Sequence, residues 1–328
     1  MRVGIIGLGA IAPLHIDALL INGEDIVALC DVNTEKCEKA IQEYGLNVTI
    51  YSDYKKMLDE AKLDAVHICT PHYLHAEMIC EGLRRGINVL SEKPLAINEE
   101  QLAQIEKAVN ESSAQLGVCF QNRYNAATLY VKELTEGEEF LSGSVSLIWE
   151  RNAAYYAQDK WRGTWDMEGG GVMINQAIHS LDLAQWFCGM PKSVTAHVDN
   201  VSLKGKIEVE DTAFAKFNLE NGGAFIVNAT NASYGSYSPC LMFQTNKKMI
   251  LMCGNHVIVN GEYVEKKDVL AKTGKVEWGV GHIKLIKDYY DCIATGRKFP
   301  IGFNEAKNTI YLIRAMYTSN GKELMIKE

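Results

Sequence analysis

A polar triad follows a run of three glycines near the middle of the chain. Asn175, His179 and Asp182 come after Gly169–Gly171 in the stretch EGGGVMINQAIHSLD. Offsets of four and three residues predict that the three side chains share one face of a single helix, whose other residues are mostly apolar. A buried polar face needs partners or a ligand, and an imidazole suits general acid–base chemistry. A core histidine held by its neighbours explains this stretch, taken alone, equally well.

A lysine between Glu92 and Pro94 offers a second group for proton transfer. Lys93 comes two residues after the predicted strand 88–91, at the end of a parallel strand where such sheets bind ligands. The proline restricts the backbone, and a lysine beside an apolar or cationic wall is less basic than usual. We therefore expect Lys93 to act in a site, although an exposed loop lysine is the usual finding at such a position.

A glycine-rich turn follows the first apolar run. Gly7, Gly9 and Ala12 form the pattern G-x-G-x-x-A between a predicted strand at 2–6 and a predicted helix at 10–22. Gly7 permits the turn, Gly9 lets a pyrophosphate approach the backbone, and Ala12 lets the helix pack closely on the strand. The phosphates would meet the helix N-terminus, where free amides favour an anion. The sequence therefore predicts a dinucleotide site.

Asp31 supports this prediction, because it ends the next predicted strand about 20 residues beyond the glycines. A carboxylate at this position accepts hydrogen bonds from the adenosine ribose. Val32 and Asn33 follow it, and no arginine is present there to bind a 2′-phosphate. NAD is favoured over NADP, and a solvated strand-end carboxylate is the alternative reading of Asp31.

Predicted strands and helices alternate up to residue 120. The strands are apolar nearly throughout, as in a parallel sheet that is covered on both faces. Residues 1–120 are predicted to form a doubly wound α/β domain that binds the dinucleotide at the carboxyl ends of its strands. The predicted cofactor contacts are Gly7, Gly9, Ala10, Ile11, Asp31, Thr70, Pro71, His75, Glu92 and Lys93.

Residues 121–328 are predicted to form a second α/β domain with a large open sheet. Its predicted strands are joined by turn signals such as Asn221-Gly222-Gly223 and Asn260-Gly261, which indicates a mainly antiparallel sheet with the glycine-rich helix on one face. Two predicted helices, 280–295 and 304–319, close the chain. Because an open sheet face favours self-association, we expect a homodimer or a homotetramer.

The composition excludes several classes of partner. Lys and Arg total 33 against 41 Asp and Glu, and no basic cluster is longer than a pair, so neither nucleic acid nor an anionic membrane is expected. The nine cysteines contain no C-x-x-C pair and lie mostly in apolar runs, which predicts buried free thiols and no metal site. With no signal-peptide pattern, the expected location is the cytoplasm.

Six motifs together resemble the Gfo/Idh/MocA oxidoreductases, the group typified by glucose–fructose oxidoreductase and inositol 2-dehydrogenase. The resemblance covers nearly the whole chain, and it is the order and spacing of the motifs that make it specific. The motifs are GLGAIA, TPHYLH, SEKPLA, QNRY, WRGTWDMEGGGVMINQAIHSLD and VEDTAFAKF.

The resemblance implies a Rossmann domain followed by an α/β domain whose open sheet forms a subunit interface. It implies that Lys93 and His179 face the nicotinamide from opposite domains, with Glu92 near the nicotinamide ribose. This chain has Asn175 where the family commonly has an aspartate, so we expect Asn175 to hydrogen-bond a substrate hydroxyl. The other residues that match substrate-pocket positions are Arg123, Trp161 and Arg162.

The expected reaction is the reversible oxidation of a secondary hydroxyl on a sugar, a cyclitol or a sugar derivative, with NAD as hydride acceptor. His179 and Lys93 would share the hydroxyl proton and stabilise the oxygen, and the sequence does not rank them as base. Two alternatives stay open. One is an NAD-dependent glycosidase with transient oxidation, and the other is a catalytically inactive dinucleotide-binding regulator.

Overall fold

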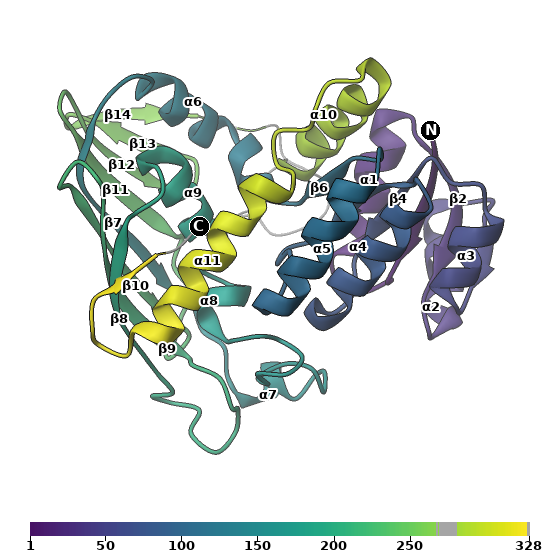
Figure 1. Ribbon diagram of the computed structural model, residues 1–328, viewed down its shortest axis with the longest axis horizontal. Coiled ribbons are helices and arrows are strands. Elements are labelled where there is room, and N and C mark those ends of the chain that lie inside the picture. Colours follow the sequence, from purple (N-terminus) through teal and green to yellow (C-terminus); the bar gives the residue numbers. More distant parts are fainter. Residues whose placement is uncertain (267, 269–280, 327–328) are drawn as a thin grey trace. The chain divides into compact units, whose positions relative to one another are not determined.

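The computed structural model describes residues 1–266, 268 and 281–326, which fall into two compact units (Figure 1). The first unit comprises Met1–Gln121 with the described part of Leu270–Lys307, and the second comprises Asn122–Val269 and Asn308–Glu328, again as far as they are described. Val280, the predicted start of a helix, lies outside the described residues. In the described ranges, no helix has the length and hydrophobicity that crossing a membrane requires.

Six parallel strands form the sheet of the first unit. Their order is β3-β2-β1-β4-β5-β6, the order of a doubly wound dinucleotide-binding sheet, so the predicted fold of this half is confirmed. All of these strands except the edge strand β3 are largely buried on both faces, which is why their sequences are mainly apolar. They are β1 (Arg2–Ile6), β2 (Asp25–Cys30), β3 (Thr49–Tyr51), β4 (Ala65–Ile68), β5 (Asn88–Ser91) and β6 (Leu116–Val118).

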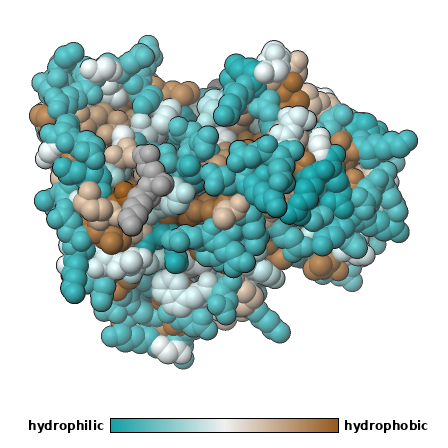
Figure 2. All heavy atoms as spheres, in the orientation of Figure 1, coloured by the Kyte–Doolittle hydropathy of each residue, from teal (hydrophilic) through white to brown (hydrophobic). Residues whose placement is uncertain are grey.

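Helices connect these strands and begin at residues suited to helix N-termini. The side chains of Asn33, Asp53 and Asn98 accept hydrogen bonds from amides of the first turn. The first helix was predicted to begin at Ala10 and begins at Ala12, where Pro13 suits the first turn. Helices α4 and α5 present a mainly hydrophilic outer surface (Figure 2). The helices are α1 (Ala12–Asn22), α2 (Thr34–Tyr44), α3 (Tyr54–Glu60), η1 (His72–Leu74), α4 (His75–Arg84) and α5 (Glu99–Glu111).

Helix α10 (Gly281–Thr295) belongs to the first unit, although the sequence analysis divides the chain at residue 120 and assigns this helix to the second domain. It packs on α1, and Asn22 Nδ2 donates a hydrogen bond to the carbonyl of Ile283 (3.2 Å). Leu285, Ile286 and Tyr289 are fully buried. Helical periodicity shows that a helix has an apolar face, but it does not show which element covers that face.

Nine strands form the sheet of the second unit, in the order β14-β13-β12-β11-β7-β10-β9-β8-β15. Only β7 and β10 pair in parallel among the described pairs, so the predicted large, mainly antiparallel sheet is confirmed. The strands are β7 (Phe140–Ile148), β8 (Ser193–Asp199), β9 (Thr212–Asn218), β10 (Ala224–Thr230), β11 (Cys240–Thr245), β12 (Met249–Cys253), β13 (His256–Val259), β14 (Glu262–Glu265) and β15 (Leu324–Met325).

The two faces of this sheet differ because side chains alternate along each strand. One face packs against helices, with α9 on β7 and α8 on β10. The opposite face leaves Phe214, Ile226 and Met242 between 44% and 54% exposed. The helices of the second unit are α6 (Ala126–Leu134), α7 (Ala153–Tyr156), α8 (Val172–Asn175), α9 (Ile178–Cys188) and most of α11 (Phe303–Ser319), with a short 3-10 turn η2 (Gln121–Tyr124) before α6.

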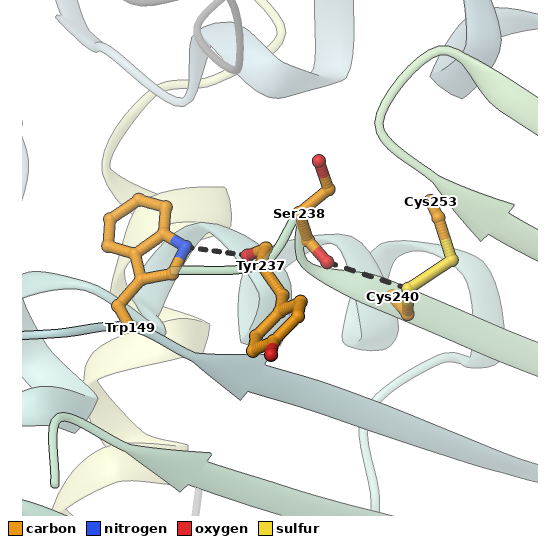
Figure 3. The surroundings of a disulfide bond; sticks show 5 residues. All are labelled: Trp149, Tyr237, Ser238, Cys240 and Cys253. Atoms are coloured by element: carbon orange, nitrogen blue, oxygen red, sulfur yellow. Dashed lines mark hydrogen bonds between the residues drawn. A yellow bond between two sulfur atoms is a disulfide. The ribbon is translucent and has the colours of Figure 1, made fainter. Parts of the chain in front are cut away.

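Two of the nine cysteines form a disulfide, which corrects the expectation that the thiols are free. Cys240 on β11 lies directly opposite Cys253 on β12, with their Cα atoms 4.3 Å apart (Figure 3). Beside it, Trp149 Nε1 donates to the carbonyl of Tyr237 (2.9 Å). The register of the hairpin brings the two sulfurs together, and no sequence spacing reveals that register. The other seven cysteines are free, six of them buried.

The disulfide predicts a thiol count. Unreduced protein denatured in guanidinium should expose seven thiols to Ellman's reagent, because Cys240 and Cys253 are bonded, and reduction before the assay should raise the count to nine. A Cys240→Ser/Cys253→Ser variant, as control, should give seven thiols under both conditions. Nine thiols in the unreduced wild-type protein would contradict the bond.

Candidate active site

The glycine turn after β1 has the shape that a dinucleotide requires. Gly7 has φ +88°, and a Cβ there would lie 2.6 Å from the carbonyl oxygen of Cys69, so only glycine fits. A Cβ on Gly9 would meet nothing within 4 Å, which leaves open space above the turn. Ala10 and Ile11 complete the turn before α1. The backbone therefore fits a pyrophosphate at this helix N-terminus.

Asp31 lies beside this turn at the end of β2. Its carboxylate accepts hydrogen bonds from the amides of Leu8 (2.8 Å) and Asn33 (2.9 Å), which fixes it next to the glycines. The ammonium of Lys36 is 3.6 Å away, a contact that the sequence reasoning missed. The carboxylate is therefore held beside the glycine turn, and both its predicted contact with a ribose and the choice between NAD and NADP stay predictions.

His75 joins two loops at the carboxyl edge of the sheet. Its Nε2 lies 2.9 Å from the carbonyl oxygen of Thr70, and its Nδ1 lies 2.8 Å from that of Pro94. Burial lowers the pKa of His75 against the opposing effect of these carbonyls. Pro71 precedes the short turn η1, between Thr70 and the helix that carries His75. The ring therefore ties the loop after β4 to the loop that carries Lys93, and its predicted contact with the cofactor stays a prediction.

Glu92 is buried directly after β5 and fixes the backbone of Lys93. Its Oε2 accepts a hydrogen bond from the amide of Lys93 (3.2 Å), and its Oε1 lies 3.1 Å from Nε2 of His15 and 3.3 Å from Nε2 of His282. Burial alone raises the pKa of Glu92, but the hydrogen bonds from the two histidines hold it well below its ordinary value. Lys93 is half-buried and is joined to Pro94 by a cis peptide bond.

His15 and His282 were not predicted as site residues. They lie on α1 and α10, far from Glu92 in sequence, and each is an isolated histidine within an amphipathic or apolar helix. Cys119, after β6, is also close, and one donor atom each of His15, Glu92 and Cys119 lie within 4.8 Å of one another, a spacing that a metal ion could bridge. Only the folded contacts reveal this group.

In the second unit the predicted single helix is two helices. The helix α8 ends at Asn175 and α9 begins at Ile178, and the amide of Ala177 bonds to the carbonyl of Val172 (2.8 Å), five residues back. This wider turn breaks the regular 3.6-residue repeat. Asn175 lies on α8, whereas His179 and Asp182 lie on α9, so the predicted single helix is wrong. Asn175 and His179 are half-buried, and Asp182 is buried.

Glu168 lies beside Asn175 and was missed by the sequence reasoning. Its buried carboxylate accepts hydrogen bonds from Asn175 Nδ2 (2.5 Å) and from the amide of Gly163 (2.5 Å). Asn175 therefore has a carboxylate partner seven residues earlier in the chain. The only sequence signal was an acidic residue next to the three glycines, which gives no indication of its partner.

Glu210 anchors the start of α8. Its carboxylate accepts hydrogen bonds from the amides of Gly171 (2.9 Å) and Met173 (3.0 Å) and from the hydroxyl of Tyr317 (2.9 Å). Burial raises the pKa of Glu210 to about 7. A Cβ on Gly171 would lie 1.8 Å from the carbonyl oxygen of Glu210, so the segment before β9 and the start of α8 can approach this closely only at a glycine.

Arg123 forms a buried ion pair with Asp182. Its Nε and Nη2 donate to the two carboxylate oxygens at 2.8 and 2.7 Å, and Thr309 Oγ1 lies 3.3 Å from the same carboxylate. The guanidinium also lies 5.0 Å from the ring centroid of Trp186. This pair links η2 to α9, and the predicted contact of Arg123 with substrate stays a prediction.

Arg162 lies between two aromatic rings. Its guanidinium carbon is 4.6 Å from the ring centroid of Trp161 and 4.7 Å from that of Tyr155, and it donates to Asp159 (3.0 Å) and to the hydroxyl of Tyr155 (2.6 Å). These cation–π contacts and hydrogen bonds hold the four side chains together. Lys93 and His179 belong to different units, and their predicted convergence stays a prediction.

Two family models match the chain. Residues 1–120 match an oxidoreductase family with an NAD-binding Rossmann fold, and residues 139–253 match the GFO/IDH/MocA C-terminal domain. The D-glucoside 3-dehydrogenase of Escherichia coli (strain K12) is 28% identical over 266 residues, which cover 73% of this chain and 74% of that protein. The myo-inositol 2-dehydrogenase of Thermotoga maritima is 25% identical over 249 residues, covering 72% and 70%.

A solved structure extends the likeness to the whole chain. The WlbA dehydrogenase from Bordetella pertussis, in complex with NADH and UDP-GlcNAcA, matches with a TM-score of 0.89 and 27% identity. The match covers 100% of this chain and 98% of that one. The predicted family and fold are confirmed by these matches.

The buried ion pair of Arg123 with Asp182 predicts a large effect on stability. Asp182→Asn removes the carboxylate that balances a buried guanidinium, so the free energy of unfolding should fall by about 3–5 kcal/mol, measured by guanidinium denaturation. Asp291→Asn breaks an exposed pair with Lys287 and should cost far less. Equal losses in the two variants would show that the buried ion pair contributes no more to the free energy of unfolding than the exposed one.

Proposed function

This chain belongs to the Gfo/Idh/MocA family of oxidoreductases, and we propose that it oxidises a secondary hydroxyl of a sugar, cyclitol or sugar derivative with NAD as hydride acceptor. One observation supports this most strongly. The glycine turn follows β1, Asp31 follows β2 and Lys93 comes shortly after β5, and because these strands are parallel their carboxyl ends lie on one edge of the sheet. Lys93 thus has its amine at the same edge of the sheet as the proposed dinucleotide site, where it is suited to act beside a nicotinamide.

The proposed reaction moves a hydride and a proton from one alcohol. When bound, NAD accepts the hydride at C4 of the nicotinamide. The alcohol carbon becomes a carbonyl, and the hydroxyl proton must pass to a base. We assign this proton to His179, with Lys93 as the donor of a hydrogen bond that stabilises negative charge on the oxygen, and the two residues can exchange these roles.

The proposed substrate class follows from what the relatives act on or bind. Glucosides, myo-inositol and UDP-GlcNAcA are named for three of them, and all contain a six-membered ring with several secondary hydroxyls. Trp161 and Arg162, which contact each other, offer an aromatic ring and a guanidinium, and Asn175 offers a side-chain amide for a hydroxyl. We propose that these residues bind the ring, with Arg123 as a further contact.

We also propose that two or four copies associate through the exposed face of the nine-stranded sheet. Phe214, Ile226 and Met242 expose apolar surface on that face, and such surface favours association. The seven free cysteines support a reducing location, the cytoplasm, whereas the disulfide of Cys240 with Cys253 argues against it. The carboxylate of Asp31 supports NAD over NADP, because it would repel a 2′-phosphate.

Two substitutions test the catalytic assignment. Lys93→Ala and His179→Ala should each lower kcat by about 10²–10⁴-fold, since general acid–base catalysis is worth that much, while the dissociation constant for NAD changes little. Lys107→Ala and His256→Ala, which alter exposed side chains, are the controls. Near-normal turnover in both active-site variants would refute the assignment.

A substrate panel tests the reaction and the cofactor. Glucosides, inositols and UDP-sugars should produce net NADH absorbance with at least one member, and NAD should be preferred over NADP. Asp31→Ser should reduce that preference by roughly tenfold or more, as expected for a lost bidentate ribose contact. Product without net NADH would favour transient oxidation, and NAD binding with no turnover of any compound would favour a regulator.

A further inference from the structure

A buried chain of titratable side chains crosses the first unit. It runs from Tyr290 on α10 through His67 on β4 and His15 on α1 to Glu92 after β5, where His282 of α10 joins it. Each of the five side chains belongs to a residue that is at most 5% exposed. Apart from Glu92, none of them has a role in the proposed reaction so far.

Each contact along the chain is short enough for a hydrogen bond. The hydroxyl of Tyr290 lies 2.9 Å from Nε2 of His67. Nδ1 of His67 lies 2.8 Å from Nδ1 of His15, and Nε2 of His15 lies 3.1 Å from Oε1 of Glu92. The rings of His15 and His67 meet edge to face, at 81°. The path from Tyr290 to Glu92 is therefore continuous.

The contacts restrict where protons can sit. The Nδ1–Nδ1 contact needs one donor and one acceptor. A neutral His15 with its only proton on Nδ1 would turn the lone pair of Nε2 toward the carboxylate of Glu92, which is repulsive. His15 therefore carries a proton on Nε2. Its Nδ1 can then accept from Nδ1–H of His67 or carry a second proton, and both arrangements satisfy the contact between the two rings. The second arrangement makes His15 an imidazolium, whose charge balances the buried Glu92. His67 then accepts at Nδ1 and stays neutral.

The groups around His15 favour this charged form. Burial by itself lowers the pKa of His15, but Cys69 and Glu92 outweigh it and raise that pKa to about 9. Burial and the charge of His15 lower the pKa of His67 well below its ordinary value. The titratable groups that face His15 from the neighbouring elements are His67 and Cys69 from β4 and its end, Glu92 from the end of β5, Cys119 from the end of β6, and His282 from α10.

Glu92 connects this chain to the proposed reaction, because its Oε2 accepts the backbone amide of Lys93. Resting on the proposed function, we propose that His15 is a positioning residue: its imidazolium keeps Glu92 ionised and oriented, and Glu92 holds the backbone from which Lys93 acts. His15 lies in the first turns of α1, directly after the dinucleotide turn. Helix α1 thus supports the proposed phosphate site at its N-terminus and, through His15 and Glu92, the backbone of Lys93.

A metal ion is the competing explanation for part of this cluster, since donor atoms of His15, Glu92 and Cys119 lie close together. The hydrogen-bonded form is favoured because His15 and His282 both approach one oxygen, Oε1 of Glu92, at donor–acceptor distances. Metal content is one outcome of the test.

The charge of His15 can be measured without turnover. Wild-type protein with ¹⁵N-labelled histidine should show both ring nitrogens of His15 protonated at pH 7.5, with the signals assigned by their loss in His15→Gln. Because the pKa of His15 is raised above 6.5, the charge should be complete below that pH and should disappear as the pH rises through about 9. A neutral His15 at pH 7.5 would overturn the proposal.

Turnover tests the positioning role. His15→Gln keeps an amide donor toward Glu92 but has no charge, so it should lower kcat at least tenfold while the dissociation constant for NAD stays within threefold. Wild-type kcat should fall above pH 9, and this alkaline limb should be absent in His15→Gln. Glu92→Gln should show a similar loss, and the double variant should be no worse than either single one. His256→Gln, an exposed change, is the control.

The possible results distinguish failure of the proposed function from failure of the positioning role of His15. No turnover of any polyol by wild-type protein would defeat the proposed function, while the NMR measurement would still decide the charge of His15. Normal kcat and an unchanged pH profile in His15→Gln, in a wild-type protein that turns over, would defeat the positioning role alone. Stoichiometric metal in wild-type protein that is lost in His15→Gln would replace the proposal by a metal site.

Discussion

Buried carboxylates organise both units, because an ionised group away from water is stable only with donors around it. Glu92 receives two histidines and the amide of Lys93. Asp182 receives the guanidinium of Arg123, and Glu168 receives Asn175. Each of these contacts fixes a residue at, or next to, a predicted site position. The need to pair each buried charge therefore also fixes the positions of residues that are proposed to act in the reaction.

The second unit meets this requirement by departing from regular structure. Helix α8 is short, its first amides are held by Glu210, and a wider turn separates it from α9. The close approach of Gly171 to the backbone of Glu210 excludes any larger residue. His179 thus lies near the start of α9, which the ion pair of Asp182 with Arg123 links to η2.

The sequence correctly predicted the features that depend on residues close together in the chain. The glycine turn, the parallel strands and the hairpins follow from spacing, apolar runs and turn residues, and the family follows from motif order. What it missed depends on contacts between distant segments: His15 and His282 at Glu92, Glu168 at Asn175, and Cys240 opposite Cys253. The break between α8 and α9 was missed because an apolar stretch with helical spacing does not reveal which carbonyl an amide will choose.

The first unit is not continuous in sequence, and this affects how the protein is made. Its sheet ends at residue 118, but α10, which covers α1 and supplies His282, is synthesised only after the whole nine-stranded sheet apart from β15. In a nascent chain, the apolar flank of the nucleotide-binding half therefore stays exposed until α10 has been synthesised. Chaperones would meet that flank during translation, and the half could mature only near the end of synthesis.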